Sequence, residues 1–247
     1  MDITHRDTLR LALGATAVSL LKGDLAMADS TPQPPTTARS DVRAPAYRGL
    51  NEVRPLPFDP SKLRGLSEKL ITSHHQNNHT GAVKRLNQIQ QQIGALPKDA
   101  APYQLGSLKR EELIATNSMI LHELYFGNLG GDGKAGGTVV SLLKAQYASM
   151  EDWEAEFRLA CLSLGGGSGW VVLNHNPRIG GVHTYWAADH THGLAWGTPL
   201  LVMDMYEHAY HRDYGANARG YVDAFFQNIK WDEVNRRAGE SSRKVPS

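Results

Sequence analysis

Residues 204–210 read Asp-Met-Tyr-Glu-His-Ala-Tyr, and this stretch carries most of the information about the fold and the site. Asp204 and His208 are four residues apart, so on a helical turn their side chains would point the same way. A carboxylate and an imidazole that converge are two ligands of a redox-metal site, which needs further ligands. His74 and His122, far upstream, are the candidates. If these segments meet in the fold, the site is His, His, Asp, His.

The overall composition is that of an ordinary globular protein. The residues are 41% hydrophobic and 21% charged, and the formal net charge is +1. A chain of 247 residues is long enough to bury a core in one domain or in two small ones. This balance gives no support to a nucleic-acid partner. Cys161 is the only cysteine, which excludes an intramolecular disulfide. Its apolar neighbours favour a small buried residue over a reactive thiol.

The N-terminus has the pattern of an export signal. Arg6 and Arg10 precede an apolar run, and Ala26-Met27-Ala28 offers a small-x-small cleavage site. We expect residues 1–28 to be the signal and the protein to be periplasmic or otherwise exported. The alternative is a disordered or docking arm on a cytoplasmic protein. No segment is long enough for a membrane span.

The first half of the folded part is predicted to be a helical hairpin over residues 59–130, preceded by an extended Pro-rich leader over 29–58 that could wrap over it. Ser67 is a plausible N-cap for a helix that ends at Gly94. Apolar residues at helical spacing predict a second helix over about 107–126.

The second half predicts a different architecture, over residues 131–237, with a polar tail over 238–247. A helix over about 138–164 leads through a glycine-rich turn into three short strands, and a last helix follows. The fold class is therefore α+β, an N-terminal helical hairpin followed by a domain with a small three-stranded antiparallel sheet flanked by helices. The strands are expected at 170–174, 181–187 and 200–203, and the last helix at 222–237.

Four motifs in order resemble those of the iron/manganese superoxide dismutase family, over about Pro57 to Val234. The opening stretch 204–210 matches the most diagnostic of them. The others are Ser73-His74-His75 with His79, Val83 and Leu86-Asn87, then Asn117 with His122-Glu-Leu-Tyr125-Phe126, and the Gly-rich run 164–170 that ends in Trp170.

The resemblance implies one iron or manganese ion per subunit, with a slight lean to iron. The ligands would be His74, His122, Asp204 and His208, with solvent as the fifth ligand, and the substrate would be superoxide. It also implies a homodimer or higher oligomer, in which Glu207 reaches the partner's His208 and His211 lies at the same interface.

The residues around the ligands depart from the family pattern. Ala82 and Asn78 stand where the family has its gateway Tyr and His, Tyr206 replaces a Trp, and His211 replaces a Tyr. At the second-helix position for the solvent-contacting Gln, Ser118 is too short to reach. We expect His190, rather than His192, to take that place. His79 is either a substitute donor or a solvent-facing residue, and Tyr125, Trp170 and Tyr206 complete the surroundings.

Two further functions compete with dismutation. The departures at Asn78, Ala82, Tyr206 and His211 leave open a non-enzymatic metal-binding protein with the same fold and weak or lost activity. A zinc hydrolase with the same ligands is the weaker alternative, because the chain has no HExxH spacing.

Overall fold

The first long element is a helix that starts at its predicted cap. In the computed structural model, which describes residues 44–243, the Ser67 side chain accepts a hydrogen bond from the backbone N–H of Leu70. Helix α1 (Glu68–Ser73) then passes through a π-helix (His74–His79) into α2 (Thr80–Ala95). The sequence predicted one regular helix here, so the π-helix is a correction.

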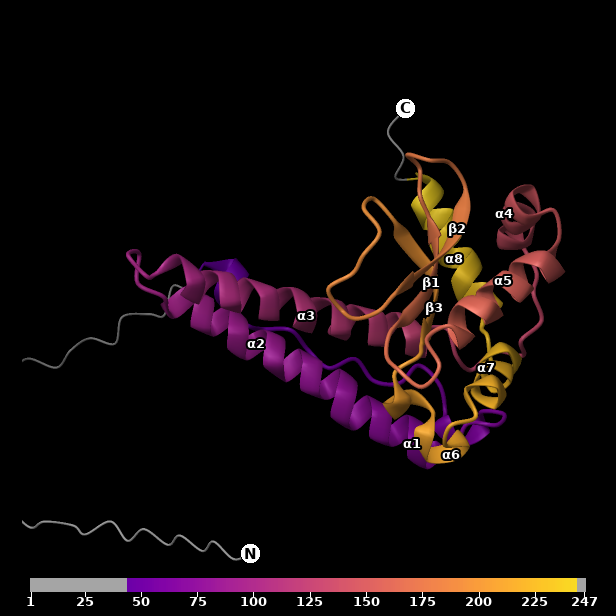
Figure 1. The fold of residues 1–247 in the computed structure, drawn as a ribbon, viewed down its shortest axis with the longest axis horizontal. Helices are drawn as coiled ribbons and strands as arrows, with labels where there is room; N and C mark the ends of the chain where they lie inside the picture. Colours follow the sequence, from indigo (N-terminus) through magenta and orange to yellow (C-terminus); the bar gives the residue numbers. More distant parts are fainter. Residues whose placement is uncertain (1–43, 244–247) are drawn as a thin grey trace, which may run out of the picture. The chain divides into compact units, whose positions relative to one another are not determined.

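The partner of α2 is α3 (Pro102–Gly127), which packs against it to form the predicted hairpin (Figure 1). The helix starts earlier than predicted because Pro102 suits a first helical position and the Gln104 side chain accepts from the backbone N–H of Ala101. A small apolar cluster holds the hairpin together; its members are Leu86, Ile89, Ile93 and Ala115.

The described end of the leader is fastened to this hairpin. The Asn87 side chain accepts from the backbone N–H and side-chain amide of Asn51 at 2.9 and 2.8 Å, and donates to the Asn51 carbonyl at 2.9 Å. Gly49 has a φ of +62°, and a Cβ there would lie 2.4 Å from the Asn87 carbonyl oxygen. The described part of the leader, residues 44–58, therefore packs on α2 through Gly49 and Asn51. The export signal predicted for residues 1–28 lies outside the described residues.

The three strands lie where they were expected and are antiparallel, in the order β2-β1-β3. Their bounds are β1 (Trp170–His175), β2 (Val182–Ala187) and β3 (Thr198–Asp204). Trp170 pairs with Asp204 across β1 and β3, so the register brings the two residues to one end of the sheet. Helices α3 and α8 both pack against β3.

The predicted helices of the second half are each divided in two. The helix expected over 138–164 is α4 (Thr138–Tyr147) and α5 (Met150–Leu162), because Ala148 has a φ of +62° and Ser149 caps α5. The helix expected over 222–237 is α7 (Ala218–Gln227) and α8 (Trp231–Arg243), which follow the short α6 (His211–Tyr214). The α+β fold class is confirmed.

One apolar core joins the sheet to the surrounding helices. Its largest fully buried side chains include Trp153, Phe157, Tyr221 and Phe225, together with Trp170 beside the site. The Cys161 thiol is buried in it, as expected, and burial raises its pKa. Helix α8 continues past residue 237, where a polar tail was expected, and buries Ala238 and Ser241. Within residues 44–243 no helix has the length and apolar character needed to cross a membrane.

Candidate metal centre

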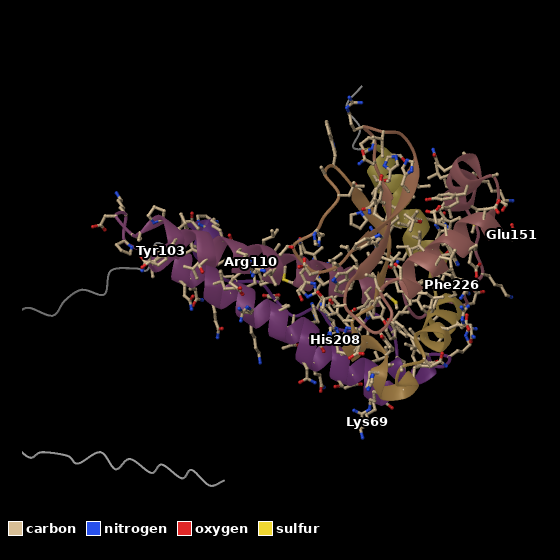
Figure 2. All side chains as sticks on the ribbon, in the orientation of Figure 1. Lys69, Tyr103, Arg110, Glu151, His208 and Phe226 are labelled. Carbon is tan, nitrogen blue, oxygen red and sulfur yellow. The ribbon has the colours of Figure 1, made fainter. Side chains whose placement is uncertain are left out.

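Four side chains from four separate elements converge at the end of the sheet where β3 finishes. His74 opens the π-helix, His122 belongs to α3, Asp204 is the last residue of β3, and His208 lies in a 3-10 turn, Glu207–Ala209. The first three are buried, while the His208 side chain is 28% exposed. Figure 2 shows His208 towards the end of the hairpin at which Lys69 of α1 lies, well away from Tyr103 at the other end.

The pairing of Asp204 with His208 has a different basis from the predicted one. Asp204 ends a strand, and Tyr206 follows with extended backbone before the 3-10 turn, so the two ligands do not share a helical turn. The chain reverses instead around a hydrogen bond from the Tyr206 backbone N–H to Asp204 Oδ1, at 2.8 Å. The convergence was correctly predicted, but the helical geometry was wrong.

The donor atoms surround one carboxylate oxygen. Asp204 Oδ2 lies 3.1 Å from Nε2 of His74, 3.2 Å from Nε2 of His208 and 3.5 Å from Nε2 of His122. One donor atom from each of the four residues lies within 4.8 Å of the others. Ligands held about 2.1 Å from one ion are about 3.0 to 3.6 Å apart at ordinary coordination angles. The three separations therefore match ligands of a single metal ion.

The hydrogen bonds of His122 prepare it for that role. Its Nδ1 donates to the carbonyl oxygen of Ser118 at 2.6 Å, so the neutral ring carries its proton on Nδ1. Its Nε2 is buried and has no hydrogen-bond partner within the described residues. The lone pair of His122 Nε2 is therefore buried near the Asp204 carboxylate, and a metal ion between the two would bind both. Three imidazoles and a carboxylate suit iron, manganese or zinc.

The site holds its ligands in the charge states that metal binding needs. Burial would raise the pKa of Asp204, but hydrogen bonds from His208 and His74 outweigh it and keep that pKa below its usual range. Burial lowers the pKa of His74, and it lowers that of His122 to about 3. At neutral pH the site therefore presents an ionised carboxylate, with the imidazoles of His74 and His122 neutral.

Aromatic side chains enclose the ligands. The Trp170 ring lies 5.1 Å from that of His122, the Tyr125 ring 5.3 Å from that of His74, and the Tyr206 ring stacks on His208 at 5.3 Å. Burial raises the pKa of Tyr206 to about 12, so its hydroxyl stays protonated at neutral pH. These three residues therefore lie where the sequence placed them.

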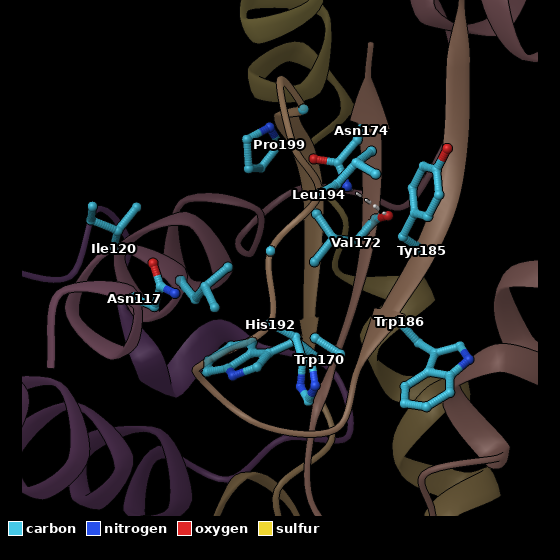
Figure 3. A pocket seen from close by; sticks show the side chains of 14 residues that line it. Asn117, Ile120, Trp170, Val172, Asn174, Tyr185, Trp186, His192, Leu194 and Pro199 are labelled. Atoms are coloured by element: carbon cyan, nitrogen blue, oxygen red, sulfur yellow. Dashed lines mark hydrogen bonds between the residues drawn. The ribbon is translucent and has the colours of Figure 1, made fainter. Parts of the chain in front are cut away.

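Of the two candidate histidines in 189–192, His190 is the one beside the ligands. Its ring is 4.8 Å from Tyr206 and 6.3 Å from His122, and its Nδ1 accepts a 2.8 Å hydrogen bond from Trp170 Nε1. His192 is 59% exposed and pairs with Asp189. Figure 3 shows His192 and Trp170 both lining a separate pocket of about 410 Å³ between the sheet and α3.

The other predicted residues lie outside the ligand cluster. His79 is buried, so the solvent-facing alternative is wrong, but its ring contacts are with His75 and Phe126. Glu207 and His211 are exposed in the single chain. Ala82, which stands where the family has its gateway Tyr, is buried.

The sequence did not predict the hydrogen bonds that hold the backbone of Asp204 and the loop of His190 in place. The Tyr221 hydroxyl donates to the backbone carbonyl of Asp204 at 2.7 Å and lies 3.1 Å from the Tyr125 hydroxyl. Asn117 donates from its side chain to the His190 carbonyl at 2.6 Å and so holds the His190 loop on α3. Asn117 is in a stretch quoted above and Tyr221 is not, and neither spacing nor residue type signals these contacts.

Known proteins resemble the chain over most of its length. Residues 135–237 match the model of the iron/manganese superoxide dismutases, C-terminal domain. The superoxide dismutase [Fe] of Cupriavidus metallidurans CH34 is 53% identical over 195 residues, 78% of this chain and 99% of that protein. The superoxide dismutase [Fe] of Aquifex aeolicus is 30% identical, over 76% of this chain and 92% of that protein. Superoxide dismutase [Mn] 1 of Halobacterium salinarum is 29% identical, over 78% and 97%.

Proposed function

The chain belongs to the iron/manganese superoxide dismutase family, and from that premise we propose that it disproportionates superoxide to oxygen and hydrogen peroxide. The observation that carries this function is the cluster of His74, His122, Asp204 and His208 around one carboxylate oxygen. A bound iron or manganese ion would supply the redox chemistry, alternating between the +3 and +2 states as successive superoxide ions are oxidised and reduced.

The protein supplies the charge and the protons. Asp204 holds a full negative charge among three imidazoles, which lowers the net charge of the loaded site. Trp170 donates to His190 Nδ1, so the neutral His190 ring carries its proton on Nε2, away from the indole. That N–H and the Tyr206 hydroxyl are the donors from which protons can reach the reduced product.

The proposed activity is tested on metal-quantified protein. Wild-type protein is expected to remove superoxide in pulse radiolysis, and His208→Ala is expected to lose that activity because it removes one ligand. His183→Gln, on strand β2, is the matched control and should retain it. Full metal occupancy with no activity above that of free metal would contradict the proposal and favour the non-enzymatic metal-binding alternative, which rests on Asn78, Ala82, Tyr206 and His211.

We propose iron as the working metal. The donor set suits both metals, but the 53% identical protein of C. metallidurans is named an iron enzyme. Metal-free protein reconstituted separately with iron and with manganese should regain more activity with iron. Greater recovery with manganese would reverse the assignment.

We also propose that the chain is exported and acts as a homodimer or a larger homo-oligomer. Exposed Glu207 and His211 flank the partly exposed His208, and this supports an interface that would cover the open side of the site. Glu207→Ala should shift sedimentation of the loaded protein towards the monomer.

The signal-like residues 1–28 support export, and N-terminal sequencing of protein recovered from the periplasm should begin at Asp29.

A further inference from the structure

The pocket between the sheet and α3 takes no part in the proposed dismutation. It has a volume of about 410 Å³, and none of the four metal ligands lines it. Its walls come from α3, from strands β1 and β2, and from the loop 188–197 between β2 and β3. It shares Trp170 with the surroundings of the metal ligands. A volume of this size is typical of a small-molecule site.

The loop 188–197, which closes one side of the pocket, is held near both of its ends. Asn117 Nδ2 donates to the carbonyl oxygen of His190 at 2.6 Å, and this fixes the loop to α3. Asn176 Nδ2 donates to the carbonyl oxygen of Ala195 at 3.0 Å, and this fixes it to the turn after β1. Because the wall is already held in place, little further ordering of the chain opposes the binding of a ligand.

The walls of the pocket are apolar and aromatic. Val172 is two residues after Trp170 on β1 and pairs with Tyr185 of β2, so these three side chains lie on one face of the sheet. Ile120 of α3 adds apolar surface and is 41% exposed. The described residues that line the pocket include no Asp, Glu, Lys or Arg. This lining suits an uncharged ligand with a flat aromatic ring.

Two side-chain amides reach the pocket, Asn117 from α3 and Asn174 from β1 (Figure 3). Each uses its NH₂ group within the protein, Asn117 on the carbonyl of His190 and Asn174 on that of Val172 at 3.4 Å. Within residues 44–243, no group donates a hydrogen bond to Oδ1 of either residue. Asn174 is only 5% exposed, and buried acceptors are nearly always paired. A Cβ at position 197 would lie 3.1 Å from Asn174 Oδ1, so Gly197 leaves this acceptor open to the pocket.

We propose that the pocket binds an uncharged phenolic compound, a flat molecule of one or two aromatic rings that carries a hydroxyl group. Its ring packs against Trp170, Val172 and Tyr185, and its hydroxyl donates to Asn174 Oδ1. A phenol combines the two features that this lining calls for, a flat apolar body and a hydrogen-bond donor. An aromatic carboxylate would instead place a charge and further acceptors beside an oxygen that needs a donor.

The test is equilibrium dialysis of iron-loaded protein against 2-naphthol at neutral pH, read as the fluorescence of free ligand on the protein-free side. One bound equivalent is expected. 2-Methoxynaphthalene has the same rings but no donor, and it should bind about three- to tenfold more weakly because one hydrogen bond is lost. Asn174→Leu, which removes the acceptor, should weaken the binding of 2-naphthol by a similar factor.

Leu194→Trp distinguishes binding in the pocket from binding to the iron. Leu194 lines the pocket, so the larger side chain should fill it and abolish the equivalent, whereas naphthol bound to iron would remain. Leu159→Trp, at an exposed position of α5 that does not line the pocket, is the matched control and should bind as the wild type does. Iron content and circular dichroism of each variant establish that the fold is intact.

The proposal is overturned if wild-type protein binds no 2-naphthol, or if it binds 2-methoxynaphthalene as tightly. It is also overturned if Asn174→Leu or Leu194→Trp binds 2-naphthol as the wild type does. The first two comparisons use wild-type protein alone, so they decide the matter even where a variant fails to fold. Dialysis measures binding and not turnover, so failure of this site and failure of the proposed function are distinguishable.

Discussion

Trp170 links the metal ligands to the proton supply through a single hydrogen bond. Its indole packs edge-on against His122, while Nε1 donates to His190 Nδ1. A neutral imidazole that accepts on Nδ1 must carry its proton on Nε2. The indole therefore selects the tautomer of His190, and an aromatic ring without the N–H would lose that selection.

Trp170→Phe tests this function of the indole. We expect unchanged metal content and a turnover reduced about three- to tenfold, since one hydrogen bond contributes about 0.5–1.5 kcal/mol. Stopped-flow superoxide decay on metal-quantified protein measures it. Trp196→Phe, at an exposed position, is the control. Wild-type turnover in Trp170→Phe would show that the bond to His190 is not needed.

At the ligands themselves, residue types gave the four candidates, and the family resemblance of their motifs implied that these four residues meet. What they could not predict is how each is held. Ser118 was judged only by its short side chain, whereas its carbonyl oxygen orients His122. Tyr221 supports Asp204 through a backbone carbonyl. Backbone acceptors are common to every residue, so sequence alone does not single out these contacts.

The π-helix is the main element that the sequence pattern concealed. At its end, the backbone N–H of Thr80 donates a hydrogen bond to the carbonyl oxygen of His75, five residues back. The Thr80 hydroxyl donates to the same oxygen at 3.1 Å. Such wide turns are rare and often occur at functional sites. Here it carries His74 at its start and His79 at its end, between two regular helices whose apolar residues keep ordinary helical spacing.

The divided helices show why their ends were missed. Ala148 adopts a positive φ and Ser149 caps α5, but alanine is an ordinary helix former and gives no sign of a break. Asn228, between α7 and α8, bonds through its side chain to the backbone of Arg64, far away in the sequence. Contacts made only in the folded chain decide this second break.

The hydrogen bonds of Asn87 to Asn51 should stabilise the packing of the described part of the leader on α2. Asn87→Ala removes three hydrogen bonds to Asn51, so we expect the free energy of unfolding to fall by about 2 kcal/mol. Urea unfolding measures the loss, and trypsin should cleave faster after Arg54. Gln90→Ala removes one longer bond to Asn51 and should cost less. Equal stability of the two variants would contradict the proposed fastening.

For the whole molecule, the site exists only because segments distant in the chain pack together. The hairpin supplies His74 and His122, and the sheet and the turn after it supply Asp204 and His208. The sequence predicted this α+β arrangement and the antiparallel strands, because alternation and turn residues are local signals. The strand order and the pairing of Trp170 with Asp204 depend on non-local packing, which local signals do not determine.

Acid should destabilise the metal-free protein. The pKa of His122 is lowered to about 3 in the fold, so below its ordinary value near 6.5 the unfolded chain binds more protons, and stability falls as pH falls. From pH 7.5 to 5 we expect this residue alone to cost about 2 kcal/mol. Urea titrations at the two pH values measure the change. Equal stability at both would contradict a buried, neutral His122.

The measurement that tests the central claim most directly is the rate of superoxide decay against metal occupancy in one series of samples. Wild-type protein loaded with increasing iron is expected to reach one ion per catalytic cluster, and its decay rate should rise in proportion to that occupancy. His208→Ala should give no such rise. A wild-type series that fills with iron and shows no decay above that of free iron would contradict the account.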